Sequence, residues 1–97
     1  MMKLELYYED LGKLNWFDAI NECKLIEGGW IVPNRIQLQI VYKEFYKMGL
    51  GNLSNKFYWT CEEFNTQYAW SQNFDSGVQH SYTKFHKNNV RPIRIIQ

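Results

Sequence analysis

The spacing of apolar residues in the first part of the chain changes from that of a strand to that of a helix. Residues 3–7, KLELY, alternate between polar and apolar side chains, which predicts a short strand. An apolar face at helical spacing follows and consists of Trp16, Ala19, Ile20, Cys23 and Ile26. Asn15 is placed to cap this helix, with Asp18 three positions further on, and Gly28 and Gly29 are expected to end it.

A second amphipathic helix is predicted directly after the joint GGWIVPN. Pro33 favours extended backbone before it, Asn34 can cap the helix, and Gln37 can reach back to the cap. The apolar stripe of this helix consists of Leu38, Val41, Tyr42 and Phe45. Gly49 and Gly51 are expected to stop it. Because caps, packing and turn geometry explain every residue of the joint, we interpret the joint as structural.

From residue 57 onward the apolar period changes to two, which is typical of strands. The four segments with this period are FYWTCEE (57–63), QYAWSQNF (67–74), GVQHSY (77–82) and VRPIRII (90–96). Residues 75–77 suit a short hairpin loop, residues 87–89 a turn, and Pro92 indicates an edge position or a bulge. The order strand, helix, helix and strands predicts one α+β domain over residues 1–97, with the helices segregated from an antiparallel sheet.

Composition agrees with one small domain that has an aromatic core. A chain of 97 residues, 18% of them aromatic, can bury a single core without metal or disulfides. The large residues that we expect in this core are Trp16, Trp30, Trp59, Trp70 and Phe74. Eleven basic residues against ten acidic ones give a net charge of +1, so no field of one sign would attract nucleic acid.

Cys23 and Cys61 are predicted to be buried free thiols, because free cysteine behaves as a small apolar residue. A disulfide between them is the alternative. No zinc site is expected, since there is no Cys-x-x-Cys spacing and neither His80 nor His86 is near a cysteine in the sequence. The N-terminal stretch lacks the apolar core of a signal peptide, and no run has the apolar length of a membrane span.

Five short motifs occur in an order that resembles a known family. They are LNWFDAINEC, GGWIVPNRIQLQIVY, YWTCEE, AWSQNFDSG and VRPIRI, and they lie between Leu14 and Ile95. Together they resemble the collagen-like adhesin C-terminal domain family, long catalogued as a domain of unknown function in bacteria and phages. Asn34 stands where that family typically has threonine, which is conservative for a helix cap.

The resemblance implies a C-type lectin-like fold, in which two helices pack on a twisted antiparallel sheet and the two ends of the chain pair. Calcium-dependent sugar binding is not expected. Residues 32–34, Val-Pro-Asn, lack the carboxylate of the lectin triplets and precede a helix, and residues 49–56 are too short for the long ligand-carrying loop of many lectins. Glu62, Glu63 and Asp75 are the acidic residues of the strand half, whereas calcium prefers six or more oxygen ligands. We therefore predict no metal and no cofactor.

The sequence offers no set of catalytic residues. Neither His80 nor His86 has a carboxylate partner at a fixed spacing, and Glu62 and Glu63 point to opposite faces of a strand. The same two carboxylates would disfavour the thiolate of Cys61. We therefore expect that the protein is not an enzyme.

A polar and aromatic surface on the predicted strands is the candidate binding face. Its residues are Asn65, Gln67, Tyr68, Gln79, His80 and Tyr82. The alternative is an ordinary solvated sheet face.

These observations predict a non-catalytic recognition or assembly module. The adhesins are exported as parts of longer chains, whereas this sequence shows no export signal. We therefore expect a phage virion protein that contacts, at the virion surface, a host receptor (protein or glycan) or a neighbouring virion protein. The alternative is a cytoplasmic protein-binding regulatory domain of a bacterium. The oligomeric state is left open.

Overall fold

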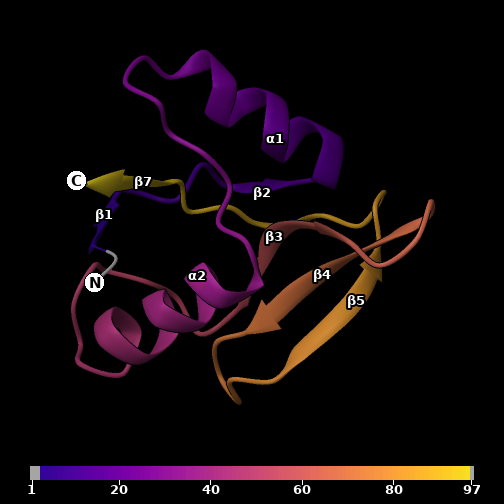
Figure 1. Ribbon diagram of the computed structural model, residues 1–97. Coiled ribbons are helices and arrows are strands. Elements are labelled where there is room, and N and C mark those ends of the chain that lie inside the picture. The colour runs from indigo at the N-terminus through magenta and orange to yellow at the C-terminus, as the bar shows by residue number, and fades with distance from the viewer. Residues whose placement is uncertain (1–2, 97) are drawn as a thin grey trace.

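A curled five-stranded sheet with one helix on each side forms the centre of the computed structural model, which describes residues 3–96 (Figure 1). The strand order is β2-β6-β3-β4-β5. These strands are β2 (Lys13–Leu14), β3 (Phe57–Glu63), β4 (Tyr68–Asn73), β5 (Gln79–Thr83) and β6 (Asn88–Asn89). β3 and β6 run parallel and the other neighbours antiparallel, so the sheet is mixed. Two further strands, β1 (Lys3–Leu6) and β7 (Ile93–Ile96), pair antiparallel next to the termini.

The two α-helices begin at the caps that the sequence predicts, Asn15 and Asn34. The helices are α1 (Trp16–Leu25), α2 (Arg35–Val41) and the π-helix η1 (Tyr42–Tyr46), which continues α2. The side chain of Asn15 accepts the backbone N–H of Asp18 at 2.9 Å. Asn34 and Gln37 form a reciprocal capping box, with both hydrogen bonds at 2.8 Å. The joint before α2 is therefore a helix-start structure, as predicted.

The sheet is buried on both faces at its centre, because α1 and α2 lie on opposite sides of β3 (Figure 1). Tyr58 and Trp59 are consecutive in β3, point to opposite faces and are both fully buried. The cluster around Trp59 contains Trp16, Ala19, Cys23, Val32, Ala69 and Val90. The cluster around Tyr58 contains Leu38, Val41, Tyr42, Phe74 and Ile93. The α+β class is confirmed, whereas the expectation of helices segregated from a purely antiparallel sheet is wrong.

Two of the five tryptophan and phenylalanine residues predicted for the core are only partly buried. The predicted residues that are buried are Trp16, Trp59 and Phe74. The guanidinium carbon of Arg94 lies 4.4 Å from the ring centroid of Trp30, and that of Arg35 lies 3.8 Å from the centroid of Trp70. A cation therefore covers each ring. An aromatic side chain also contacts each ring edge-on, with centroids 5.1 Å apart for Tyr7 and Trp30 and 5.4 Å apart for Phe64 and Trp70. The sequence prediction is wrong for Trp30 and Trp70.

The last predicted strand is divided at Pro92. Asn88 and Asn89, predicted as a turn, form β6 between β2 and β3 and are buried. β7 begins only after Pro92, whose carbonyl accepts the backbone N–H of Tyr7 at 2.9 Å. The N-terminal segment therefore runs along residues 90–96, and β1 pairs with β7 from Lys3 opposite Ile96 onward.

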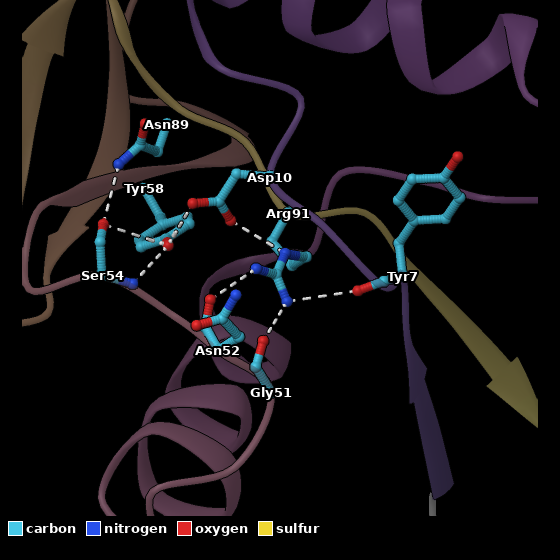
Figure 2. A network of polar contacts seen from close by, with 8 residues as sticks. All are labelled: Tyr7, Asp10, Gly51, Asn52, Ser54, Tyr58, Asn89 and Arg91. Carbon is cyan, nitrogen blue, oxygen red and sulfur yellow. Dashed lines mark hydrogen bonds and ion pairs between the residues drawn. The ribbon is translucent and has the colours of Figure 1, made fainter.

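A buried arginine joins three segments that are distant in sequence (Figure 2). Arg91 is 2% exposed and forms an ion pair with Asp10 at 2.9 Å. Its guanidinium also donates to the backbone carbonyls of Gly51 at 2.6 Å, Asn52 at 3.0 Å and Tyr7 at 3.3 Å. The five N–H groups of arginine suit such a set of acceptors, which a lysine could not reach together.

The network continues from Asp10 to the centre of the sheet (Figure 2). The hydroxyl of Tyr58 donates to the second carboxylate oxygen of Asp10 at 2.8 Å and accepts the backbone N–H of Ser54 at 3.0 Å. The side-chain amide of Asn89 donates to the Ser54 hydroxyl at 3.1 Å. Burial, together with the charge of Asp10, raises the pKa of Tyr58 to about 12, although the bonds from Ser54 act in the opposite direction.

The two kinds of tryptophan environment predict different costs of truncation. Trp59→Ala should cost about 3–5 kcal/mol of stability, because it opens a cavity in a fully buried cluster. Trp30→Ala should cost only about 1–2 kcal/mol, because this ring is partly exposed already. Urea unfolding followed by circular dichroism measures both changes. Equal losses in the two variants would contradict the described burial.

The raised pKa of Tyr58 predicts a loss of stability at alkaline pH. The unfolded chain releases this proton near pH 10, whereas the native state keeps it up to about pH 12. Stability from Tyr58 is therefore complete below pH 10 and falls by about 2–3 kcal/mol as the pH approaches 12. Urea unfolding of the parent and of Tyr58→Phe at several pH values should show the stability gap between them shrinking above pH 10. The same comparison of the parent with Tyr68→Phe, which changes an exposed tyrosine, is the control. A stability gap between the parent and Tyr58→Phe that stays constant with pH would contradict the assignment.

Candidate functional site

An open groove lies between the helical segment α2–η1 and the sheet, next to the end of β3, the turn before β5 and the start of β5. Its volume is about 680 Å³. Residues of its wall and floor include Arg35, Ile36, Gln39, Ile40, Glu62 and Gln79. α2 and η1 provide the two isoleucines and four of the polar residues, and Glu62 of β3 and Gln79 of β5 provide the other two polar residues. The groove therefore offers both kinds of contact that a binding site requires.

Arg35, in the first turn of α2, is held in place within this groove. Its guanidinium stacks on Trp70, and its Nε donates to the side-chain oxygen of Gln79 at 2.7 Å. The side-chain nitrogen of Gln79 donates back to the carbonyl of Arg35 at 2.9 Å. Within residues 3–96 no acceptor contacts the terminal nitrogens of this guanidinium, so their N–H groups are available to a bound molecule.

A chain of side-chain amides with the buried Gln72 at its centre fixes the position of Gln79. Gln72 is fully buried, and its oxygen accepts from Gln79 at 3.2 Å. Its nitrogen donates to the side chain of Gln39 at 2.5 Å and to the carbonyl of Gly77 at 3.0 Å. A buried amide is costly unless its polar atoms are satisfied, so this network strongly favours one arrangement. Through Gln79 the arrangement extends to the guanidinium of Arg35.

Glu62 adds a carboxylate to the same end of the groove. One of its oxygens accepts the backbone N–H of Arg35 at 2.8 Å. This position at the start of α2 suits a negative charge, because the free N–H groups of a helix point toward its N-terminus. The groove thus has a cationic and an anionic group next to each other, and Lys43 and Glu44 repeat this pairing of charges along its wall.

The binding face predicted from the sequence is divided between the two faces of the sheet. Gln79 and His80 are consecutive in β5 and therefore point in opposite directions. The register of β4 and β5 puts Tyr68 on the side of Gln79 and Tyr82 on the side of His80. The prediction of one continuous surface is therefore wrong. The sequence shows that these strands alternate, but it does not show their register.

Two further residues of the predicted face lie at the turn between β3 and β4. The side-chain oxygen of Asn65 accepts the backbone N–H groups of Gln67 at 2.9 Å and Tyr68 at 2.8 Å. Asn65 therefore closes the turn and is not free to contact a partner through that oxygen. The side chain of Gln67 is exposed.

Of the six predicted residues, only Gln79 lines the groove, and sequence reasoning missed its main partners. Arg35, Gln39, Glu62 and Gln72 were not singled out as site residues. A signal for two of them exists, because Arg35 and Gln39 are four residues apart and so share the face of the helix next to its apolar stripe. Gln72 gives no such signal, since its importance depends on burial.

A second surface feature lies on the other face of the sheet, where aromatic rings form a row. The rings of Tyr82 and His86 stack, with centroids 4.6 Å apart and planes at 14°. Phe57 contacts Tyr82 edge-on at 5.0 Å and lies 6.0 Å from His80. This row contains His80 and Tyr82, two of the five predicted site residues that do not line the groove.

The cysteines line a separate apolar hollow of about 230 Å³. Both are free thiols, but only Cys23 is buried, so the prediction of two buried thiols is wrong for Cys61. Burial, followed by the charge of Glu22, raises the pKa of Cys23 to about 12. Burial, followed by the charge of Glu62, also raises the pKa of Cys61. Both shifts oppose thiolate formation and hence nucleophilic reactivity.

No protein-family model matches the chain, and no curated protein matches it. The resemblance to the adhesin-type domain therefore stays a prediction. Among residues 3–96, no three or more histidine, cysteine, aspartate or glutamate side chains gather where they could hold a metal ion. No helix in the same range is long and apolar enough to cross a membrane.

Proposed function

We propose that this protein is a non-catalytic recognition or assembly module that binds its partner in the groove beside α2. The observation that carries this proposal is the fixed guanidinium of Arg35, stacked on Trp70 and bonded to Gln79, with its terminal N–H groups unpaired. An arginine held in one position loses little entropy on binding, and arginine is enriched at sites that dominate binding energy.

The composition of the groove supports a polar partner surface with hydrogen-bond acceptors. Ile36 is 70% exposed on the wall and can make apolar contacts, while Arg35 and Glu62 can pair with carbonyls, hydroxyls or amides. The mixture of charges argues against a strongly charged ligand. A protein surface and a glycan both fit this description.

The ionisable groups of the groove support the non-catalytic part of the proposal. They are Arg35, Lys43, Glu44 and Glu62. None of these is a serine, threonine or cysteine nucleophile beside a base, and Glu62 already accepts a backbone hydrogen bond. Such a set is better suited to recognition than to chemistry.

The finer fold and the biological setting are part of the same proposal. Two helices and the pairing of β1 with β7 support a C-type lectin-like fold. The motif resemblance supports a phage virion protein, exposed at the virion surface, that contacts a host receptor or a neighbouring virion protein. In the alternative setting, a bacterial cytoplasm, the same groove would bind a regulated protein.

Sedimentation of particles from a lysed source culture tests the proposal. The parent protein, detected by antibody, should sediment with virus-like particles. Purified Arg35→Ala should bind those particles roughly tenfold or more weakly, as expected for an interface arginine of central importance. Lys87→Ala is the charge-matched control, because Lys87 is exposed outside the groove, and it should bind like the parent.

Two results would count against the proposal in different ways. A pool that stays soluble, with no particle fraction, would contradict the virion setting and favour the cytoplasmic alternative. Equal particle binding by folded Arg35→Ala and the parent would contradict the groove as the binding site.

A further inference from the structure

The strand β5 is an open edge of the five-stranded sheet. It is the last strand in the order, and Figure 1 shows it at the outer side of β4. Proteins usually protect such an edge with proline, charged residues or bulges, because unpaired backbone groups attract another strand. The sequence of β5, QHSYT, contains no proline and no Lys, Arg, Asp or Glu, and its register with β4 is uninterrupted.

The phase of the hydrogen bonds shows which backbone groups of β5 point outward. Asn73 N–H donates to Val78 O at 2.9 Å, and beyond the other end of the strand Lys84 N–H donates to Gln67 O at 2.9 Å. In an antiparallel pair, bonded positions recur at every second residue, so the even-numbered residues of β5 bond to β4. The residues whose N–H and C=O groups point away from the sheet are Gln79, Ser81 and Thr83.

We propose that two copies of this chain pair antiparallel through β5, about a two-fold axis at Ser81. Ser81 then exchanges two hydrogen bonds with the partner's Ser81, and Gln79 exchanges two with the partner's Thr83, as does Thr83 with the partner's Gln79. The carbonyl of Thr83 already accepts from His86 N–H at 2.9 Å, and its second lone pair serves the partner.

The side chains of β5 favour a second copy over an unrelated strand. In this register His80 lies opposite the partner's Tyr82, at a position without backbone bonds, where side chains approach most closely. Along β5 the side chains are polar, aromatic, small, aromatic and polar, with Ser81 at the centre. This order is the same in both directions, so two antiparallel copies of β5 place like types of side chain opposite each other. The aromatic row of Phe57, His80, Tyr82 and His86 would continue across the axis.

The size of this contact predicts a weak dimer. A pair of five-residue strands buries roughly half of the ~800 Å² per partner that a standard stable interface needs. We therefore expect a dissociation constant on the order of 10–100 μM. A permanent dimer would require further contacts.

Pairing through β5 would also place two grooves on one surface. Residues directly opposite each other in an antiparallel sheet share a face, so both copies of α2 lie on the same side. The partner's Thr83 then lies beside Gln79 at the rim of each groove. This consequence rests on the proposed function, since two grooves on one face would bind a repeated partner surface with avidity.

Sedimentation equilibrium in reducing buffer, over about 1–300 μM protein, tests the dimer. The mass of the parent should rise with concentration from 11.7 kDa toward twice that value. Ser81→Pro removes one outward N–H and no bond to β4, and edge strands tolerate proline there, so this variant should stay monomeric. Ser81→Lys is a second variant, to be used if Ser81→Pro does not fold. It places like charges opposite each other at the axis and should also stay monomeric.

Asn55→Lys is the control, because it adds the same charge at an exposed position outside the strands and should dimerise like the parent. A parent that stays monomeric over the whole range would overturn the proposal, as would folded Ser81→Pro or Ser81→Lys variants that dimerise like the parent. Either outcome leaves the test of the groove intact, because Arg35 is not part of the β5 edge.

Discussion

The buried guanidinium of Arg91 is the constraint on which the arrangement of the chain depends. Burial of a charge is tolerated only when the charge is paired and its hydrogen bonds are made. Arg91 meets this condition with Asp10 and with backbone carbonyls from both the N-terminal segment and the loop after η1. A single side chain thus fixes the relative positions of three segments that have little secondary structure of their own.

Fixing these segments allows both faces of a small sheet to be covered. The loop that binds Arg91 leads from η1 into β3, and Tyr58 of β3 is bonded to the same Asp10. α1 can then cover the Trp59 face while α2 covers the Tyr58 face. Because α2 covers only part of its face, the outer part of β4 and β5 stays open beside it. The groove with Arg35 forms at this border between covered and open sheet.

The sequence predicts those features that depend on local chemistry. The helix starts depend on hydrogen bonds that span only three residues and involve the side chains of Asn15, Asn34 and Gln37. Such short-range patterns can be recognised in the sequence. The segment 57–63 is one strand with the predicted bounds. Features that depend on strand register or on distant partners cannot be predicted from the sequence in this way. Gln79 and His80 were assigned to one face because the sequence does not show which residue of β4 lies opposite each of them.

Dependence on distant partners also explains why the sequence analysis placed Trp70 in the core and did not identify Arg35 as a site residue. A tryptophan in a strand suggests an apolar core, yet a guanidinium from a helix 35 positions earlier covers this ring. Neither residue indicates the other, because cation–π contacts have no sequence spacing. The buried amide of Gln72 is similar, since glutamine is usually exposed and hydrogen bonds with Gln39, Gln79 and the carbonyl of Gly77 make its burial tolerable.

The stability of Arg91→Met tests the central claim most directly, because methionine keeps much of the side-chain volume and removes the charge. Urea unfolding should show a loss of about 3–5 kcal/mol, since Asp10 and the surrounding carbonyls lose their partner in a buried site. The double variant Asp10→Asn with Arg91→Met should recover part of this loss, because the unpaired carboxylate is then absent. A loss below about 1 kcal/mol for Arg91→Met would contradict the account, since the three segments would then be held in place without the guanidinium.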